Sequence, residues 1–211
     1  VSLAASERRG REAEIDPAGL VSRYDATEAL KAAGFDFLNL ATNHVLDGGT
    51  LGMFRTRERL EALGIATGGV GQTQAEAREL KTVEARGLRL GFLCYAEDSN
   101  YTLSTTGPCH AWYTPETVLE DIGAHRSEVD VLVVSVHADL ENVETPSPGR
   151  RDSFREFARA GAQVVLGHHP HVPQGVEVFE GALLAYSLGN SYFFPHTRPW
   201  MKHKRPHTAH S

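Results

Sequence analysis

Apolar runs and stretches of mixed polarity alternate along the chain, and this pattern predicts strands interleaved with helices. The near-continuous apolar runs at 129–137 (VDVLVVSVH) and 162–167 (AQVVLG) are typical of strands buried on both faces of a sheet. The run at 35–41 (FDFLNLA) also predicts a strand. Further strands are expected at 65–67 and in two hairpins, which turn at Arg86-Gly87 and at Glu180-Gly181.

Helices are predicted where apolar residues recur every three or four positions. Within 49–63, the apolar residues Leu51, Phe54, Leu60 and Leu63 are separated by charged residues, which indicates an amphipathic helix. The predicted helices cover residues 25–34, 49–63, 74–79, 115–126 and 148–160, with Thr114 as the N-cap of the fourth, and 98–113 is expected to be a long loop. Because strands alternate with helices, we expect an α/β fold with a mixed, largely parallel sheet covered by helices.

The composition fits a single globular α/β domain. The chain has 211 residues, of which 41% are hydrophobic and 23% are charged. Its formal net charge of −6 argues against nucleic acid as a partner, because proteins that bind a phosphate backbone usually carry a basic face. The apolar runs are shorter than the ~20 residues that span a bilayer. The polar opening stretch 1–19 shows no signal-peptide pattern.

The two cysteines and about half of the histidines are expected to take no part in a functional site. Cys94 lies in an apolar run and is expected to be a small core residue, although one disulfide with Cys109 is compatible with the sequence. The histidines expected to be exposed polar side chains are His110, His125, His203, His207 and His210, and His196 is left unassigned.

Three clusters of amide and imidazole side chains follow predicted strands at the point where each strand ends. Asn43 and His44 follow 35–41, His137 ends 129–137, and His168, His169 and His171 follow 162–167. The carboxyl ends of strands form the ligand crevice of open α/β sheets, so the three clusters can converge on one point. Neutral imidazole and amide oxygen are workable metal ligands. The sequence therefore predicts a metal site at this edge of the sheet.

The motifs around these residues resemble those of CapA-type proteins of capsule and poly-γ-glutamate synthesis, in the calcineurin-like metallophosphoesterase superfamily. Residues 41–49 (ATNHVLDGG) resemble the family's Asn-Asn-His-x-x-Asp motif, with Thr42 in place of the first Asn. Residues 135–141 (SVHADLE) resemble its His-Trp-Gly-x-Glu motif and keep His137 and Glu141. Residues 167–190 (GHHPHVPQGVEVFEGALLAYSLGN) are similar to its most specific stretch almost throughout.

The resemblance implies a calcineurin-like fold, with mixed sheets flanked by helices, and a site for a divalent metal such as Mn, Zn, Fe or Ca. The metal ligands implied are Asn43, His137, His169 and His171, and the candidate catalytic residues are His44 as the acid, Asp47 as its orienting partner, and His168. The family-like domain is expected to cover 25–195, preceded by an irregular segment at 1–24 and followed by a flexible tail at 196–211.

The resemblance also implies acidic ligands from N-terminal strands, and these are not evident. Val1 to Ala4 lie roughly where an Asn-Leu-Glu motif is expected, but Ala4 cannot bind a metal. We expect either that these strands lie outside the sequence or that the site is reduced to one weakly bound metal. For Asp139, Glu141 and Asn190, a role in the site and a role as an ordinary loop or turn residue are equally consistent with the sequence. The aromatic residues 192–194 are expected to pack under the edge of the site.

Three functions are consistent with these residues. A metal-dependent hydrolase of capsule or poly-γ-glutamate biosynthesis would use metal-activated water, with His44 as the acid, on a phosphoester or an amide. A peptide epimerase would use His/Asp acid–base pairs, such as His137 with Asp139. A non-catalytic subunit would bind an anionic polymer or assemble a synthase complex. The expected partners are thus an anionic polymer, a peptide or a phosphoester, and synthase subunits, and the resemblance suggests the bacterial cell envelope.

Overall fold

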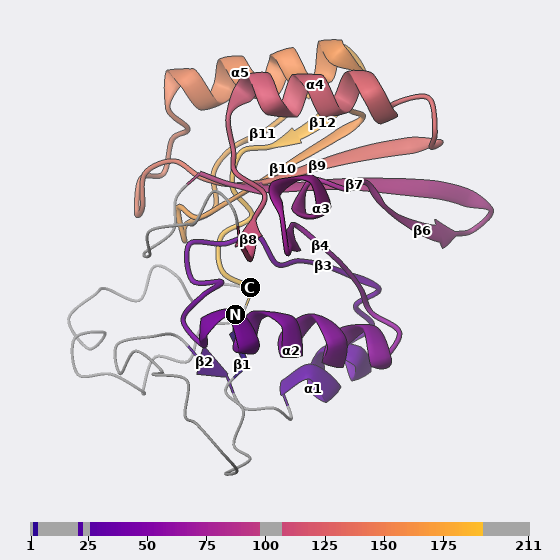
Figure 1. The fold of residues 1–211 in the computed structure, drawn as a ribbon. Coiled ribbons are helices and arrows are strands. Elements are labelled where there is room, and N and C mark those ends of the chain that lie inside the picture. Colours follow the sequence, from indigo (N-terminus) through magenta and orange to yellow (C-terminus); the bar gives the residue numbers. More distant parts are fainter. Residues whose placement is uncertain (1, 4–20, 23–25, 98–106, 192–211) are drawn as a thin grey trace, which may run out of the picture.

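A six-stranded mixed sheet forms the centre of the molecule (Figure 1). The computed structural model describes residues 2–3, 21–22, 26–97 and 107–191. The strands of the sheet are β6 (Lys81–Ala85), β7 (Leu88–Ala96), β9 (Val131–His137), β10 (Val164–His168), β11 (Val176–Phe179) and β12 (Ala182–Ala185). Their order is β11-β12-β10-β9-β7-β6, and the four inner strands are parallel. The inner strands therefore end at one common edge.

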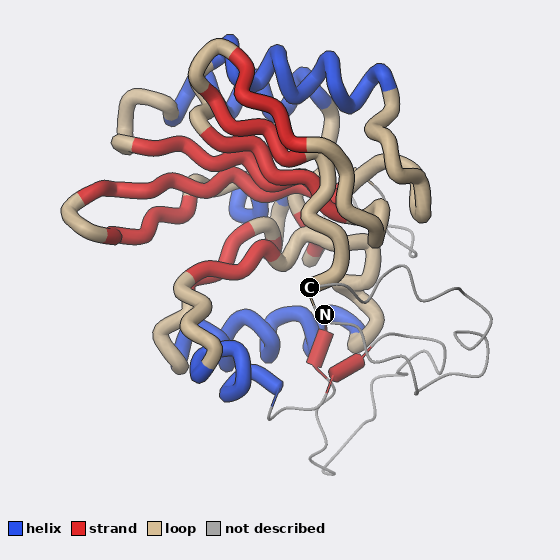
Figure 2. Tube along the Cα trace, turned by 180° about the vertical axis from the view of Figure 1, so that it is seen from behind, coloured by secondary structure: helices blue, strands red, loops and turns tan. Residues whose placement is uncertain are grey.

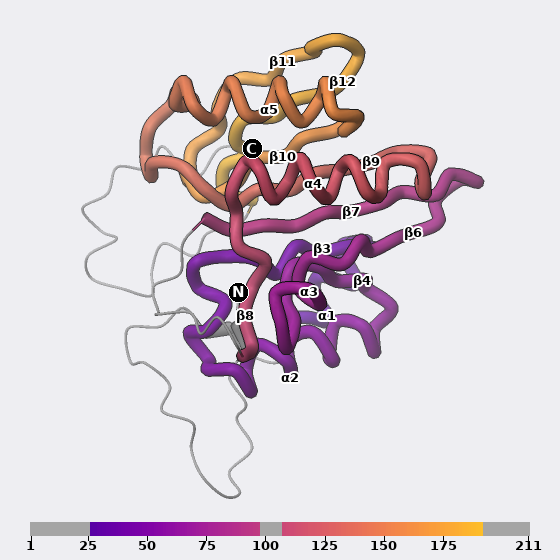
Figure 3. Tube along the Cα trace, turned by 45° about the horizontal axis from the view of Figure 1, so that its top comes forward, coloured from indigo at the N-terminus to yellow at the C-terminus, as the bar shows by residue number. Residues whose placement is uncertain are grey.

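Two helices, α4 (Pro115–His125) and α5 (Pro148–Ala160), cover one face of this sheet (Figures 1 and 3). Each helix begins with a proline that follows an N-cap residue with a hydroxyl group. The Thr114 side chain accepts a hydrogen bond from the Thr117 N–H, and the Ser147 side chain accepts one from the Arg150 N–H. The apolar side chains between helices and sheet form the main core. Its largest fully buried members include Tyr95, Phe154, Phe157, Ile122, Leu132 and Leu184.

A second layer lies on the opposite face of the sheet (Figures 1 and 2). It contains α1 (Ala26–Ala32), β3 (Phe37–Asn39), α2 (Gly49–Ala62) and β4 (Ala66–Gly68), with β3 and β4 paired in parallel. The rings of Phe37 on β3 and Phe92 on β7 stack 3.9 Å apart and join this layer to the main sheet. A smaller core around Met53, Leu60 and Ile65 fills the layer itself.

The remaining elements are short. They are β1 (Ser2–Leu3), paired in parallel with β2 (Val21–Ser22), then β5 (Val70–Gly71), α3 (Gln74–Ala77) and β8 (Cys109–His110), with β5 and β8 antiparallel. Two of these pairs fall where no strand was expected. β1 and β2 lie within 1–24, which was predicted to be irregular, and β8 lies within the predicted loop 98–113. The tail at 196–211 lies outside the described residues.

The predicted helices and long strands are confirmed in place, but the buried face of α2 differs from the prediction. Leu51 is 49% exposed, whereas Gly52, Met53, Thr56 and Leu60 are buried. α2 packs against β1 and β4. Leu60 is buried and Phe54 packs against the same core, as predicted, so Leu51 is the position at which the buried face differs from the prediction.

The prediction that His110 is exposed was wrong. β8 pairs with β5, and the His110 side chain is fully buried, with its ring stacked on that of Trp112. Cys94 is buried, as expected, and neither it nor Cys109 forms a disulfide. His125 lies at the end of α4, where its Nδ1 atom is 2.9 Å from Glu128 Oε1. Within the described residues, no helix is long and apolar enough to cross a membrane.

Gly167, near the end of β10, is predicted to tolerate no side chain. A Cβ atom there would collide with the carbonyl oxygen of Tyr186 and lie 2.6 Å from Arg150 Nη2, both tightly held groups. Gly167→Ala should lower the free energy of unfolding in urea by at least ~1–3 kcal/mol, the usual cost of overpacking. Gly123→Ala is the control, since a Cβ there meets no atom within 4 Å; inside helix α4 it should stabilise by ~0.5–1 kcal/mol. Equal stability of the two variants would contradict this packing.

Candidate metal centre

The register of the parallel strands brings the histidines of the site to one edge. His137 at the end of β9 lies directly opposite His168 at the end of β10, and Ala96 at the end of β7 is the partner of His137 on the other side. Alternation along β9 sends Val134 and Val136 into the helix-covered core and Ser135 and His137 toward the second layer. The imidazole of His137 therefore faces the layer that carries Asn43.

Asn43 reaches the site from a tight run of turns between β3 and α2. The Val45 N–H donates to the Thr42 carbonyl and the Asp47 N–H to the His44 carbonyl, so the backbone folds back on itself. Asn43 is only 8% exposed, which is unusual for an amide side chain outside regular structure. The turns present its side chain to β9 rather than to solvent.

Three potential ligand atoms converge at this point. His137 Nε2 lies 2.9 Å from Asn43 Oδ1 and 3.1 Å from His169 Nδ1. Ligand atoms bound at roughly 2.1 Å to one ion lie roughly 3 Å apart, which is the spacing found here. A single imidazole N–H can donate well to only one of its two neighbours, whereas a cation binds the lone pairs of all three at once. The donor set therefore fits a metal ion.

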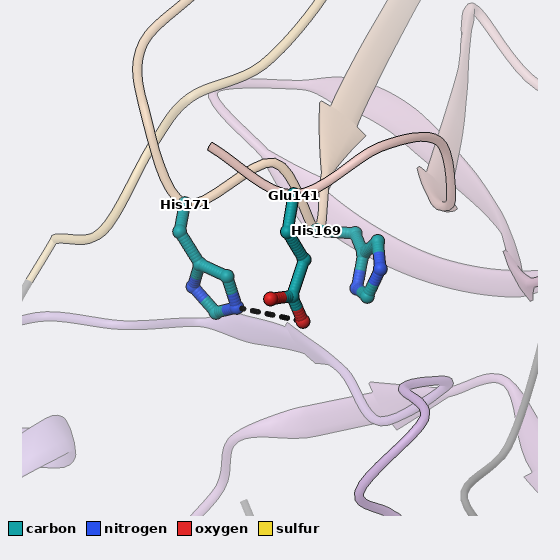
Figure 4. A group of neighbouring side chains, drawn as sticks. All are labelled: Glu141, His169 and His171. Carbon is teal, nitrogen blue, oxygen red and sulfur yellow. Dashed lines mark ion pairs between the residues drawn. The ribbon is translucent and has the colours of Figure 1, made fainter. Parts of the chain in front are cut away.

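Glu141 and His171 extend the site on the side of His169. Potential ligand atoms of Glu141, His169 and His171 all lie within 4.8 Å of one another. Figure 4 shows the Glu141 carboxylate between the two imidazole rings. His171 Nε2 lies 4.0 Å from Glu141 Oε1, and its Nδ1 atom donates to Asn190 Oδ1 at 2.9 Å. The bond to Asn190 fixes the orientation and the tautomer of the ring.

The imidazoles at the centre of the site are held neutral. Burial, together with the neighbouring histidines, lowers the pKa of His137 to about 2. Burial also lowers the pKa of His169, and burial and the nearby Arg150 charge lower that of His168 to about 4. Metal binding to a histidine requires the deprotonated nitrogen, so no proton need be displaced at neutral pH.

Two loops around the site contain backbone conformations that residues other than glycine rarely adopt. His169 (φ 91°) and His171 (φ 62°) are left-handed, and so are Asp139 (φ 82°) and Asn142 (φ 61°) in the facing loop. The Asn142 N–H donates to the Pro170 carbonyl at 2.8 Å and holds the loops together. Non-glycine residues in this region cost of order 1–3 kcal/mol each and gather at functional sites.

His44 and Asp47 form a pair beside the ligand atoms. His44 Nδ1 lies 2.9 Å from Asp47 Oδ2, and Asp47 is almost fully buried, whereas the His44 side chain is 28% exposed. A carboxylate on Nδ1 fixes the orientation and the tautomer of the ring. The geometry suits a histidine that exchanges a proton with a bound molecule.

His168 belongs to a partly buried chain of hydrogen bonds that joins the two layers. Its Nε2 atom lies 3.1 Å from Ser135 Oγ, and Ser135 Oγ accepts from Asn39 Nδ2 at 2.9 Å. Asn39 Oδ1 in turn accepts from the Ala41 N–H at 2.8 Å. The chain thus fixes β9 and β10 to the segment that leads to Asn43.

Asp139, which follows the His137 strand, directs its carboxylate toward α5. Its Oδ2 atom accepts from the Ser147 N–H at 3.1 Å and lies 3.7 Å from Arg150 Nη1. The Asp139 carboxylate is thus engaged at the start of the helix.

The structure brings the predicted ligands Asn43, His137 and His169 together, with His171 beside them and His44 with Asp47 nearby. It adds Glu141 and Asn190, for which the sequence left the role open, and the linking residues Asn39 and Ser135, which no sequence pattern selected. Asn39 and Ser135 lie inside apolar strands, and a polar residue within such a run was the only available signal. The aromatic residues 192–194 and His196 lie outside the described residues.

Comparison with known proteins gives one family. The model of the bacterial capsule synthesis protein family, PGA_cap, matches residues 9–194. "Capsule biosynthesis protein CapA" of Bacillus anthracis is 28% identical over 82% of this chain and 44% of its own length. "PGA biosynthesis protein CapA" of Bacillus subtilis is 28% identical over 82% of this chain and 47% of its own. The chain thus spans less than half the length of these curated relatives.

Two further matches are more distant. A "Probable polyglutamine synthesis accessory protein" of Mycobacterium tuberculosis is 26% identical over 79% of this chain and 47% of its own length. Among solved structures, a hypothetical protein from Thermus thermophilus superposes with a TM-score of 0.48 at 17% identity, covering 77% of this chain and 56% of that one.

Removal of the Ser135 hydroxyl is predicted to destabilise the protein. Ser135→Ala leaves the partly buried Asn39 Nδ2 and His168 Nε2 without their shared partner, which should cost ~1–3 kcal/mol. Thr82→Ala, which removes a hydroxyl from the exposed side of edge strand β6, is the matched control and should stay within ~0.5 kcal/mol of the parent. Urea unfolding followed by circular dichroism measures both. A Ser135→Ala protein as stable as the control would show that the chain does not join the layers.

Proposed function

The chain belongs to the bacterial capsule synthesis protein family, PGA_cap, and we propose that it is a metal-dependent hydrolase of capsule or poly-γ-glutamate biosynthesis. The observation that carries the proposal is the convergence of Asn43 Oδ1, His137 Nε2 and His169 Nδ1 at 2.9 and 3.1 Å. The mixed sheet with helices on its face supports the calcineurin-like metallophosphoesterase fold as its scaffold. The names of its relatives, in capsule, PGA and polyglutamine synthesis, support the assignment to this biosynthesis.

The donor set favours Mn, Zn or Fe over Ca. Asn43, His137 and His169 would hold one ion, and His171 with Glu141 would hold a neighbouring ion or complete the first coordination sphere. Imidazole nitrogen suits transition metals and zinc, whereas calcium takes oxygen ligands almost throughout. Glu141 would supply the anionic charge that Asn and His ligands lack. The site would then have one acidic ligand, although none is evident among the N-terminal residues of the sequence.

Hydrolysis needs a nucleophile, a polarised bond and a protonated leaving group. A bound divalent ion supplies Lewis-acid activation of water and of the scissile group. His44, held by Asp47 through Nδ1, would deliver a proton from Nε2 to the leaving oxygen or nitrogen. His168 would act indirectly in this scheme, because its Nε2 atom is engaged with Ser135 inside the protein. Its role would be to position the strand end that leads to His169.

The substrate class follows from the chemistry of the site and the names of the relatives. A cationic centre lined by neutral imidazoles attracts an anionic group, as in a phosphoester or a γ-glutamyl polymer. Epimerisation is the weaker alternative, because the Asp139 carboxylate that would pair with His137 is engaged with Ser147 and Arg150. A non-catalytic polymer-binding role would not require the His44–Asp47 pair. We therefore favour hydrolysis.

Replacement of His137 is predicted to abolish tight metal binding. His137 contacts both other ligands, so His137→Ala should weaken Mn²⁺ binding by more than the ~10–100-fold that loss of an outer-sphere partner costs. His125→Ala is the control, because His125 pairs with Glu128 at the end of α4. Isothermal titration calorimetry measures both. Parent protein that takes up neither Mn²⁺ nor Zn²⁺ would refute the proposal, and so would a His137→Ala protein that binds like the parent.

Replacement of His44 is predicted to separate catalysis from metal binding. His44→Ala should lower the hydrolysis rate by ~10²–10⁴-fold, the usual contribution of a general acid, with Mn²⁺ affinity unchanged. Asp47→Asn should reduce the rate by a smaller factor, because the ring stays but loses its orienting charge. p-Nitrophenyl phosphate and a γ-glutamyl peptide are the two test substrates, and His125→Ala is again the control. Full activity of His44→Ala on the hydrolysed substrate would exclude the acid role.

A further inference from the structure

Arg150 in the first turn of α5 sends its guanidinium under the ends of the two strands that carry the site. The residue is only 6% exposed. Its Nη1 atom donates to the Ala138 carbonyl at 2.6 Å, and Nη2 donates to the carbonyls of His168 at 3.1 Å and Val136 at 3.3 Å. One side chain therefore binds β9 and β10 at once.

The three carbonyls are those that control the direction of the candidate ligands. Those of Val136 and Ala138 lie on either side of His137, and that of His168 directly precedes His169. Holding these peptide groups fixes the backbone from which each imidazole projects. His169 is also left-handed (φ 91°), a conformation that persists only where its surroundings enforce it.

The surrounding residues are arranged to admit this guanidinium. Gly167 lies above it, and a Cβ atom there would come within 2.6 Å of Arg150 Nη2. The Phe154 ring lies 5.2 Å from the guanidinium carbon, and Asp139 Oδ2 is 3.7 Å from Nη1. Thus a glycine, an aromatic ring and a carboxylate accommodate one buried cation.

Burial of an arginine at this position carries a cost. Arg150 Nε has no hydrogen-bond partner among the described residues, and burial lowers the Arg150 pKa. Removal of one partner from a buried pair such as Arg150 and Asp139 is destabilising in its turn. What the buried guanidinium provides is the set of bonds to the carbonyls at the two strand ends.

We propose that Arg150 is a positioning residue of the metal centre, which aims His137 and His169 by binding the carbonyl groups around them. The inference rests on the proposed function, because it deepens the account of the same site. It assigns Arg150 no contact with metal or substrate. Its effect is exerted through the backbone of two strands.

The test compares three variants on the same helix. Arg150→Met removes all three carbonyl bonds, and Arg150→Lys keeps the charge and can form only part of them. Arg155→Met is the matched control, because Arg155 also lies on α5 and its side chain pairs with Glu177 at 2.7 Å, on β11. Co²⁺ is the probe, with affinity from titration of its visible bands and folding from circular dichroism. Imidazole NMR signals of His137 and His169 are recorded without metal.

Arg150→Met is expected to bind Co²⁺ ~10–100-fold more weakly, the range for partners that orient metal ligands. Arg150→Lys should be intermediate, with altered band shape, and Arg155→Met should match the parent. The metal-free imidazole signals should move in the Arg150 variants only. If Arg150→Met does not fold, the Co²⁺ affinity and the imidazole signals of Arg150→Lys test the positioning role.

Parent-like Co²⁺ affinity and imidazole signals in Arg150→Lys would overturn the positioning role. A parent protein that binds no Co²⁺ would instead count against the proposed function. In that case the metal-free imidazole signals alone would decide the role of Arg150.

Discussion

The contacts that His137 Nε2 makes with Asn43 Oδ1 and His169 Nδ1 are the interactions on which the candidate site depends. They bring together three segments that are far apart in sequence. Parallel pairing of β9 with β10 places His137 and His168 in register, and the left-handed turn after β10 then returns His169 toward β9. The second layer must lie against the same face of the sheet, or Asn43 could not reach. Sheet, turn and layer are each required for one meeting point.

The site is held at a cost in stability. Four non-glycine residues with left-handed backbones in two loops oppose folding. The buried imidazoles, whose pKa values are lowered, oppose it at acidic pH, where the unfolded chain takes up protons that they do not. The opposing gains come from elsewhere: the apolar core between the sheet and the helices α4 and α5, and the capped starts of both helices. Unfavourable local conformations that gather in one place, on a scaffold with favourable packing and capping elsewhere, are the pattern expected of a functional site.

Periodicity was sufficient to predict the scaffold. The long apolar run of β9, the capped helices α4 and α5, and both hairpins lie where the sequence placed them, because their patterns are local. The buried face of α2 and the strand at Cys109–His110 were not predicted, since both depend on which layer packs against them. Leu51 is apolar and yet exposed, whereas Gly52 and Thr56 beside it on the helix are buried. Periodicity cannot choose between two faces that differ in this way.

The functional site could be predicted only in part from the sequence. Strand ends and motif resemblance were enough to select the histidines and Asn43, but the contributions of Glu141 and Asn190 depend on how two loops fold around His171. Arg150 could not be selected at all, because one of two adjacent arginines in a helical turn gives no sign that its side chain lies beneath a sheet.

An anomalous-scattering map of crystals soaked in Mn²⁺ or Zn²⁺ tests the central claim most directly. The account predicts a peak bonded to Asn43 Oδ1, His137 Nε2 and His169 Nδ1 together, at roughly 2.0–2.3 Å from each. A metal peak on other residues, or a well-ordered soaked crystal without a peak at this edge of the sheet, would contradict it.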